Sequence, residues 1–201
     1  DIVRWLADVC ADRRIPFPAF YLADTMGWAN PEEIKRRVGA VREIVPQARI
    51  GLHLHDTRGL GGANVYAALQ MGVELFVMDD GWFHGRIWDT AGLGDWWPDE
   101  VKFPNGLACL IQKVNALGMD FGLWIEPEMV NPDSELYRTH PDWVIHFPTR
   151  ARTETRNQLI LNMAREDVQD YLISVLDKLL SENKITFIKW DMNRHGSEPG
   201  S

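Results

Sequence analysis

The sequence predicts an α/β protein in which a parallel sheet is covered by helices. Apolar runs of strand length alternate with segments of helical periodicity, and these runs lack the strict alternation of a half-exposed strand. A chain of 201 residues, 45% hydrophobic and 25% charged, can bury a core, so a single domain over residues 1–195 is expected. The small, polar tail 196–201 is expected to be flexible and to lie outside the fold.

The first predicted elements are a helix, a strand and a second helix. Apolar residues recur at helical spacing in the opening segment, so its helix is expected to bury one face. These residues are Ile2, Trp5, Leu6 and Val9. The run "PAFYLAD" then predicts a strand that ends at Asp24. The next helix is expected to begin after Asn30, because asparagine caps helices and Pro31 fits the first helical position.

The middle of the chain continues this alternation. "ARIGLHLHDT" predicts a strand, and "GANVYAALQMG" predicts the helix that follows it and ends at Gly72, since glycine readily adopts the conformation of a helix end. "VELFVMDDGW" predicts the third strand. A long loop rich in glycine, tryptophan and aspartate is expected over residues 83–98, before the helix "NGLACLIQKVNALG".

The last third predicts two further strands, "MDFGLWIEPE" and "KITFIKWDMNR", with the helix "REDVQDYLISVLDKLLSEN" before the second. Two short runs between them, "HPDWVIHFP" and "RNQLILNM", are expected to pair outside the main sheet. About five βα units result, whereas a closed barrel of this type needs about eight strands. We therefore expect a partial TIM-barrel-derived parallel sheet, either open and doubly wound or completed by a second copy in a homodimer.

The overall charge limits the classes of partner. A net charge of −8 and an isoelectric point near 5.2 argue against nucleic acid and against an anionic membrane, so small molecules are the expected ligands. No apolar run approaches the about 18 residues of a membrane span. Cys10 and Cys109 are expected to be reduced thiols of helix packing in a cytoplasmic protein, with a disulfide as the alternative.

Polar side chains at strand ends carry the candidate chemistry, because parallel sheets bind ligands at the carboxyl ends of their strands. His53 and His55 are two residues apart on a predicted strand, so both side chains point to one face and can share a divalent metal. Asp24, at the end of the neighbouring strand, is the expected additional oxygen ligand. The alternative is a hydrogen-bonded histidine pair in a polar core. No other cofactor is expected.

The motifs "LADTMGWANP" and "GLHLHDTRGLGGANVYAALQMGV" dominate the first third of the chain. Through them and their spacing, residues 1–73 resemble the hydroxymethylglutaryl-CoA lyase family. The resemblance implies a TIM barrel that cleaves a carbon–carbon bond with a divalent cation, with His53 and His55 as metal ligands and Asp24 nearby. The family's early Arg-Asp pair, later Asn ligand and lid cysteine have no matching positions here, so at most half of that site is implied.

A second group of motifs follows Gly72. They are "ELFVMDDGWF", "DTAGLGDWWPDEVKFPNGL", "ALGMDFGLWIEPEMVNPDSELYRTHPDWV", "RNQLILNMAREDV" and "FIKWDMNRH". Through them, residues 72–195 resemble the raffinose-hydrolysing microbial α-galactosidases. The resemblance implies a retaining glycosidase with a TIM-barrel catalytic domain, with Asp191 as nucleophile. Residues implied to hold galactose hydroxyls or to line the sugar site are Asp79, Asp80, Trp124, Lys189 and Asn193.

These residue types suit a small sugar ligand, because carboxylates accept hydrogen bonds from hydroxyls and tryptophan stacks on apolar sugar faces. A retaining mechanism also needs a second carboxylic acid roughly 5 Å from the nucleophile. The family's general acid lies on a later strand whose sequence is absent here, and Glu126, Glu128 and Asp24 are candidate substitutes. Without leaving-group protonation the rate should fall by a factor on the order of hundreds or more.

Structural roles for the same residues stay open. Asp79 and Asp80 would then cap a loop, while the tryptophans would belong to the core. Glu126 and Glu128 would pair with basic residues near the last strand, namely Lys189 or Arg194.

The two resemblances meet at Gly72-Val73, where a helix-ending glycine precedes a buried strand. An exchange of segments at this point preserves the helix cap and the strand register. We therefore expect an artificial chimeric scaffold of barrel fragments with remnants of both active sites and no efficient catalysis. The alternatives are a glycosidase completed by association of copies, and a divalent-metal-binding module.

Overall fold

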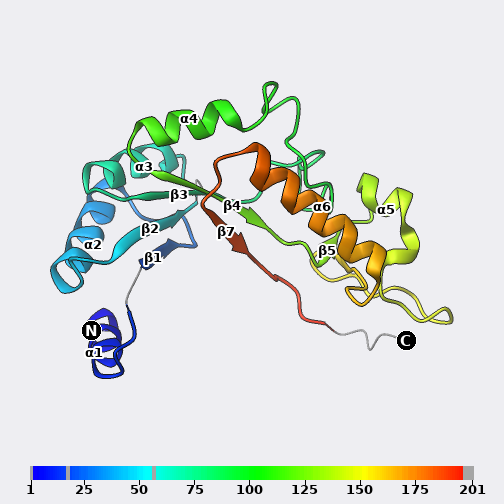
Figure 1. The fold of residues 1–201 in the computed structure, drawn as a ribbon, viewed down its shortest axis with the longest axis horizontal. Helices are drawn as coiled ribbons and strands as arrows, with labels where there is room; N and C mark the ends of the chain where they lie inside the picture. The colour runs from blue at the N-terminus through cyan, green and yellow to red at the C-terminus, as the bar shows by residue number, and fades with distance from the viewer. Residues whose placement is uncertain (1, 17–18, 56–57, 197–201) are drawn as a thin grey trace. The chain divides into compact units, whose positions relative to one another are not determined.

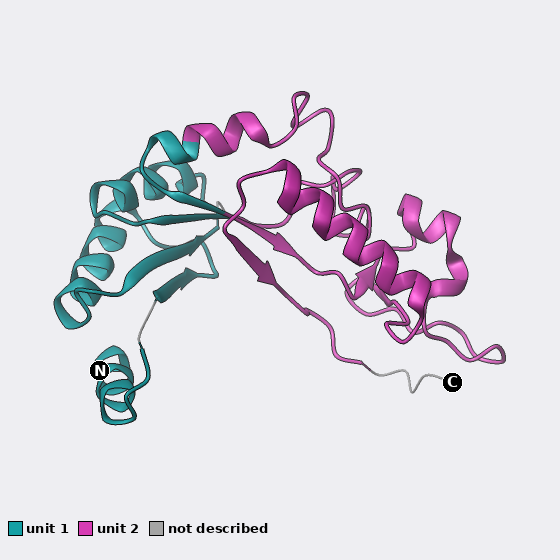
Figure 2. Cartoon of the chain, viewed as in Figure 1, with its two compact units in different colours: residues 1–77, 114–121 teal, residues 78–113, 122–201 magenta. Residues whose placement is uncertain are grey.

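The computed structural model describes residues 2–16, 19–55 and 58–196 (Figure 1). Two compact units are distinguished along the chain (Figure 2). Unit 1 comprises residues 1–77 and 114–121, and unit 2 comprises residues 78–113 and 122–201. Apart from Gly196, the predicted flexible tail lies outside the described residues.

The predicted α/β architecture is confirmed. Five strands form one sheet in the order β1-β2-β3-β4-β7, and the pairings of β1 with β2, β2 with β3 and β4 with β7 are parallel. The strands are β1 (Ala19–Asp24), β2 (Arg49–Leu54), β3 (Leu75–Met78), β4 (Asp120–Ile125) and β7 (Phe187–Trp190). Because β1 and β7 end this order, the sheet is open in the described part of the chain.

Unit 1 packs helices against the pair of strands β1 and β2. Its helices are α1 (Ile2–Asp12), α2 (Pro31–Ile44) and α3 (Gly61–Gln70). The start of α2 confirms the prediction, because Asn30 Oδ1 accepts the backbone N–H of Glu33 at 2.9 Å. Val38 of α2 and Ile50 of β2 are fully buried in the core between these elements.

The helix α1 forms and Leu6 and Val9 are half-buried, but the prediction that Ile2 and Trp5 share a buried face with them was wrong. Ile2 and Trp5 are 70% and 61% exposed, and no residue of α1 is fully buried. Val3 and Ala7 pack against the core of unit 1 instead. These two residues are four apart and therefore lie on one stripe of the helix. This contact through Val3 and Ala7 leaves the larger side chains of Ile2 and Trp5 exposed to solvent.

Unit 2 contains most of the irregular structure. The remaining elements are α4 (Ala108–Ala116), β5 (Met129–Val130), α5 (Glu135–Thr139), a 3-10 turn (Pro141–Trp143), β6 (Leu159–Ile160) and α6 (Glu166–Glu182). β5 pairs with β6 in an antiparallel arrangement, apart from the main sheet. An antiparallel bridge between Val144 and Leu161 confirms that the two short runs of this region pair.

The segment expected as a long loop, residues 83–98, is built into the core of unit 2. Phe83 and Leu93 are fully buried, and Phe83 forms an antiparallel bridge with Pro98. The buried carboxylate of Asp95 accepts the first backbone N–H groups of α5 at 2.8 and 2.9 Å. The loop therefore caps a helix 40 residues further along the chain.

The structure also bears on the expectations about a membrane span and about the two cysteines. No helix of the described residues is both long enough and apolar enough to span a bilayer. Cys10 and Cys109 are free, but Cys109 is exposed, so its assignment to helix packing was wrong.

Candidate functional site

Unit 2 contains the carboxyl ends of three strands, and polar side chains lie at or just after each of these ends. Asp79 follows β3, Glu126 follows β4, and Lys189 and Asp191 lie at the end of β7. Residues at positions 189 and 191 point to the same face, because side chains alternate along a strand. The expected polar cluster is therefore assembled from segments more than 40 residues apart.

Lys189 joins two of the predicted site carboxylates. Its Nζ lies 2.9 Å from Asp79 Oδ2 and 3.8 Å from Asp191 Oδ2. The three side chains are between 31% and 32% exposed, so solvent and small ligands can reach them. A cation between two carboxylates offsets their mutual repulsion.

Trp124 is placed to fix Asp191. Its indole Nε1 donates a hydrogen bond of 3.0 Å to Asp191 Oδ2, and its backbone oxygen accepts one from Trp82 Nε1 at 2.9 Å. The indole is only 3% exposed and stacks on the Phe83 ring at a centroid distance of 6.3 Å. Trp124 therefore acts mainly through its N–H, which is directed at Asp191, because its buried ring has little surface on which a sugar could stack.

The environment of Asp191 favours its ionised form. Burial raises the pKa of this carboxyl, but hydrogen bonds from Trp124, the Met192 N–H and Asn193, together with the Lys189 charge, bring the pKa below its ordinary value. The Met192 N–H lies 3.0 Å from Asp191 Oδ1. An ionised, oriented carboxylate is what a glycosidase nucleophile requires at neutral pH.

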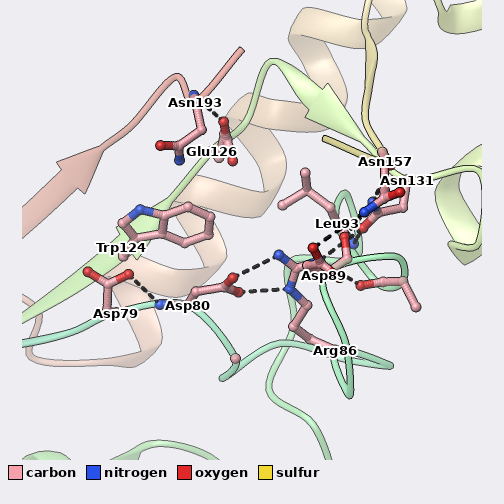
Figure 3. Close-up of polar contacts among 12 residues, drawn as sticks. Asp79, Asp80, Arg86, Asp89, Leu93, Trp124, Glu126, Asn131, Asn157 and Asn193 are labelled. Carbon is pink, nitrogen blue, oxygen red and sulfur yellow. Dashed lines mark hydrogen bonds and ion pairs between the residues drawn. The ribbon is translucent and has the colours of Figure 1, made fainter. Parts of the chain in front are cut away.

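Glu126 lies in a different environment, only 1% exposed. Its Oε1 accepts the backbone N–H of Asn193, as Figure 3 shows, and its Oε2 accepts Gln158 Nε2 at 3.1 Å. Burial raises the pKa of Glu126, while the hydrogen bonds from Asn193 and Gln158 oppose this rise and the charge of Asp191 adds to it. The two oxygens of Glu126 thus tie Asn193 and Gln158 to the end of β4.

Glu128 and Arg194, which were considered as an ion pair above, each have another partner. Glu128 Oε1 accepts a hydrogen bond of 2.9 Å from Trp190 Nε1, and Arg194 Nη1 donates to the backbone oxygen of Gln158 at 2.7 Å. Asp79 Oδ1 accepts the N–H of Asp80 at 2.8 Å, which is a local capping contact of the kind left open above. Capping and ligand binding are compatible, because a carboxylate has about four acceptor positions.

Asp80 forms a contact that sequence reasoning did not identify. Both of its oxygens are bound by the Arg86 guanidinium, with Nε at 2.9 Å and Nη2 at 2.7 Å (Figure 3). Arg86 is 7% exposed and Asp80 is 39% exposed at its side chain. One signal was available in the sequence: Arg86 is the single lysine or arginine between residues 79 and 101, in a segment rich in aspartate.

The predicted metal residues of unit 1 are only partly brought together. His53 Nε2 and His55 Nε2 lie 2.8 Å apart, with the rings edge to face. Asp24 pairs in register with Leu54 and not with either histidine, so its side chain leaves the opposite face of the sheet. Its two oxygens accept the backbone N–H groups of Trp28 and Ala29 at 3.0 Å.

This donor set does not fit a complete metal site. Among the described residues, no group of three His, Cys, Asp or Glu side chains is placed to hold a metal ion. Two imidazole nitrogens are too few for a tetrahedral or octahedral protein site. A shared metal on the histidines therefore stays a prediction from sequence.

Two family models match the chain. The model described as Melibiase matches residues 63–201, and the model described as HMGL-like matches residues 13–77. The matched ranges overlap in α3 and β3, which is the region where the two motif groups of the sequence meet. Similarity to both families within one chain is thereby confirmed.

Individual relatives are similar over part of their length. Alpha-galactosidase AgaA of Geobacillus stearothermophilus is 56% identical over 134 residues, which are 67% of this chain and 18% of that protein. The crystal structure of GH36 alpha-galactosidase AgaB from the same organism has a TM-score of 0.65 and 43% identity, covering 92% of this chain and 22% of its own. A variant of AgaA in complex with raffinose has a TM-score of 0.66 and 42% identity over the same shares. The chain thus spans roughly a fifth of the length of these relatives.

Proposed function

Because the chain belongs to the melibiase family through residues 63–201, we propose that unit 2 binds a terminal α-galactosyl group and provides the nucleophile side of its hydrolysis. The observation that carries this proposal is the contact of Lys189 with both Asp79 and Asp191, beside the Trp124 N–H. Raffinose, the ligand of a similar α-galactosidase, ends in such a group and indicates the class of ligand to test.

Recognition of the sugar would rest on the exposed carboxylates. Asp79 and Asp80 keep acceptor positions beyond those used within the protein, so each can accept hydrogen bonds from sugar hydroxyls. Lys189 adds a donor at the same place. Charge-assisted hydrogen bonds of this kind are short and directional, and therefore distinguish sugars that differ in one hydroxyl.

The proposed chemistry is slow retaining hydrolysis. The Asp191 carboxylate would attack the anomeric carbon and form an ester as the glycosidic C–O bond breaks, after which water would hydrolyse the ester. The departing oxygen takes its proton from a positioned carboxylic acid where there is one, and otherwise from solvent water, which makes the step slower. Glu126 is a poor source of that proton, because its two oxygens already accept hydrogen bonds from Asn193 and Gln158.

We therefore propose a chimeric scaffold that binds galactosides and turns them over slowly. Matches to two families in one chain support a hybrid origin, and the incomplete donor set of the histidine pair in unit 1 is consistent with it. The test is hydrolysis of a nitrophenyl α-galactoside by the purified chain. Efficient turnover that Asp191→Asn abolishes would refute slow catalysis and favour a complete active site.

Binding is tested separately by calorimetric titration with methyl α-galactoside, with methyl α-glucoside as the control sugar. The expected result is a dissociation constant for the galactoside at least several-fold below that for the glucoside. Asp79→Asn should weaken binding about tenfold, since it removes the ion pair with Lys189 and a charged acceptor. Asp170→Asn, at an exposed position of α6, is the matched control. Equal binding of both sugars would contradict the proposal.

A second candidate is a glycosidase completed by association of two copies. The open strand order favours it, because β1 and β7 each have one neighbour in the sheet and a free edge attracts another strand. In a dimer, one copy would supply the acid that protonates the leaving group of the other. Light scattering should then give the mass of a dimer, and activity per chain should rise with concentration. A monomer with concentration-independent activity would exclude this candidate.

A further inference from the structure

The ion pair of Asp80 and Arg86 belongs to a larger arrangement. Every guanidinium nitrogen of Arg86 is engaged: Nε and Nη2 bind Asp80, and Nη1 donates to the Ala91 oxygen at 3.0 Å and to Asn131 Oδ1 at 3.2 Å. Figure 3 shows the guanidinium between the Asp80 carboxylate and the Asn131 amide. The Arg86 charge also lies 5.5 Å from the centre of the Phe83 ring. Arg86 therefore has one defined orientation.

Asn131 in turn holds Arg86 and the surrounding loop. Its side chain is fully buried, and its Oδ1 accepts hydrogen bonds from both Arg86 and the Leu93 N–H, the latter at 2.8 Å. Its Nδ2 donates to the backbone oxygens of Asp89 at 3.2 Å and Asn157 at 2.6 Å (Figure 3). These four contacts use the whole hydrogen-bonding capacity of an amide side chain. Asn131 thus fixes the loop of residues 83–98, which contains Arg86, relative to Asn157.

We propose that Arg86 is a positioning residue, which holds the Asp80 carboxylate in the orientation that selects a galactosyl group over its epimers. The proposal rests on the proposed function, in which Asp80 accepts sugar hydroxyls. A fork of two parallel N–H donors fixes the plane of a carboxylate as well as its position. The two acceptor positions that remain on Asp80 then point in set directions.

A fixed plane matters for selectivity because sugar epimers differ only in the direction of one hydroxyl. A carboxylate that can rotate follows either hydroxyl, whereas a carboxylate held by Arg86 meets one of them and leaves the other unpaired. The exposures fit this arrangement, since Arg86 is buried behind the site at 7% while Asp80 faces solvent at 39%. The cation therefore acts through Asp80 and does not touch the sugar.

The competing explanation is that the pair only stabilises the loop of residues 83–98. The two explanations differ in a measurable way. Loss of folding lowers the number of binding sites per chain and leaves the dissociation constant of each remaining site unchanged. A misoriented Asp80 raises the dissociation constant of every site and lowers the preference for galactoside over glucoside.

The experiment is calorimetric titration of Arg86→Lys with methyl α-galactoside and methyl α-glucoside. Lysine keeps the charge but cannot form the two-pronged contact. We expect the galactoside dissociation constant to rise about tenfold and the ratio of the two constants to move toward one, with an unchanged number of sites. Arg138→Lys is the matched control, because Arg138 binds Asp133 and Glu135 on the exposed surface of α5.

A second variant covers the case in which Arg86→Lys folds poorly. In Arg86→Ala, millimolar guanidinium ion should occupy the vacated position beside Asp80 and restore part of the galactoside affinity, whereas the same concentration of sodium ion should not. Unchanged constants in Arg86→Lys, or a fall in the number of sites alone without rescue by guanidinium, would overturn the positioning role. Absence of galactoside binding by the unmutated chain would instead overturn the proposed function, and this inference with it.

Discussion

The strand ends of unit 1 and unit 2 both carry predicted site residues, but only in unit 2 do those residues contact one another. In unit 2, Lys189 contacts both Asp79 and Asp191, and Trp124 donates a hydrogen bond to Asp191. In unit 1, the histidine pair and Asp24 leave opposite faces of the sheet. Polar residues at the ends of neighbouring strands therefore do not by themselves form a site.

The difference lies in the loops that follow the strands. The loop after β3 is anchored by Asp95 at the start of α5 and by Asn131 beneath Arg86. The loop after β1 is held by Asp24, which accepts the N–H groups of Trp28 and Ala29, but the Met26 and Trp28 side chains stay 56% and 66% exposed. Polar residues that follow the strands can therefore be assembled in one part of a scaffold and kept apart in another, because the loops decide where they lie.

The largest expected effect comes from Asp191, the proposed nucleophile of unit 2. Asp191→Asn should lower any α-galactoside hydrolysis by a factor on the order of a thousand or more, because an amide cannot form the glycosyl ester. Galactoside affinity should change by only a few-fold. The measurement is steady-state hydrolysis together with calorimetric titration, with Asp170→Asn as the control. Residual activity equal to that of the unmutated chain would mean that Asp191 is not the nucleophile.

The next prediction compares the loss of stability when one of two buried asparagines, one in each unit, is replaced by alanine. Asn131→Ala should lower the free energy of unfolding of unit 2 by about 3 kcal/mol, because it leaves the Leu93 N–H and the Arg86 guanidinium without their acceptor. Asn64 of unit 1 is 1% exposed; among the described residues it donates one hydrogen bond, to the Ala29 oxygen, and its own oxygen accepts none. Asn64→Ala should therefore cost only about 1 kcal/mol.

Urea unfolding followed separately in the two units measures both values. Equal costs for the two asparagines would contradict the view that Asn131 anchors its loop more strongly than Asn64 does.

A smaller effect is expected in the pH dependence of stability. The pKa of Asp191 is lowered by folding, so its contribution is present above the ordinary carboxyl pKa of about 3.9 and is lost as the pH falls through the folded value. The pKa of Glu126 is raised, so the unfolded state ionises first and stability falls as the pH rises between the two values. Asp191→Asn should flatten the acid-side loss of stability in urea unfolding between about pH 2 and 5. An unchanged acid slope would contradict the lowered pKa.

The smallest effect is expected from metal in unit 1. Two converging imidazole nitrogens can bind Zn²⁺ or Mn²⁺ only weakly, so millimolar metal should raise the melting temperature by a few degrees at most. His53→Ala should remove this shift, while His195→Ala, a histidine of unit 2, should retain it. A large shift would mean that unit 1 holds a more complete metal site than the comparison with unit 2 implies.

Several features of the fold could be predicted because their causes are local. Asn30 and Pro31 begin α2 where capping chemistry requires, and Gly72 follows the end of α3 with a φ of +70°. The five strands follow from their apolar runs, and the spacing of Lys189 and Asp191 by two residues places both on one face. The roles of these residues in binding and catalysis stay predictions.

Other features could not be predicted because they depend on residues far apart in the chain. The burial of α1 through Val3 and Ala7 is set by the core it meets and not by its own periodicity. The position of Asp24 relative to the histidines depends on the register of β1 against β2, which pairs it with Leu54. A one-residue difference in register moves a side chain to the other face, and no local signal in the sequence fixes that choice.

Short-range propensity and residue type were enough to predict the order of helices and strands, the similarity to two enzyme families and the polar residues at the strand ends. The contacts of Arg86 with Asp80 and with Asn131, 45 residues away, could be seen only in the folded chain, as could the hydrogen bond from Trp124 to Asp191 across 67 residues. Hydrogen bonds act over about 3 Å. Which groups come within that distance is set by how the whole chain packs.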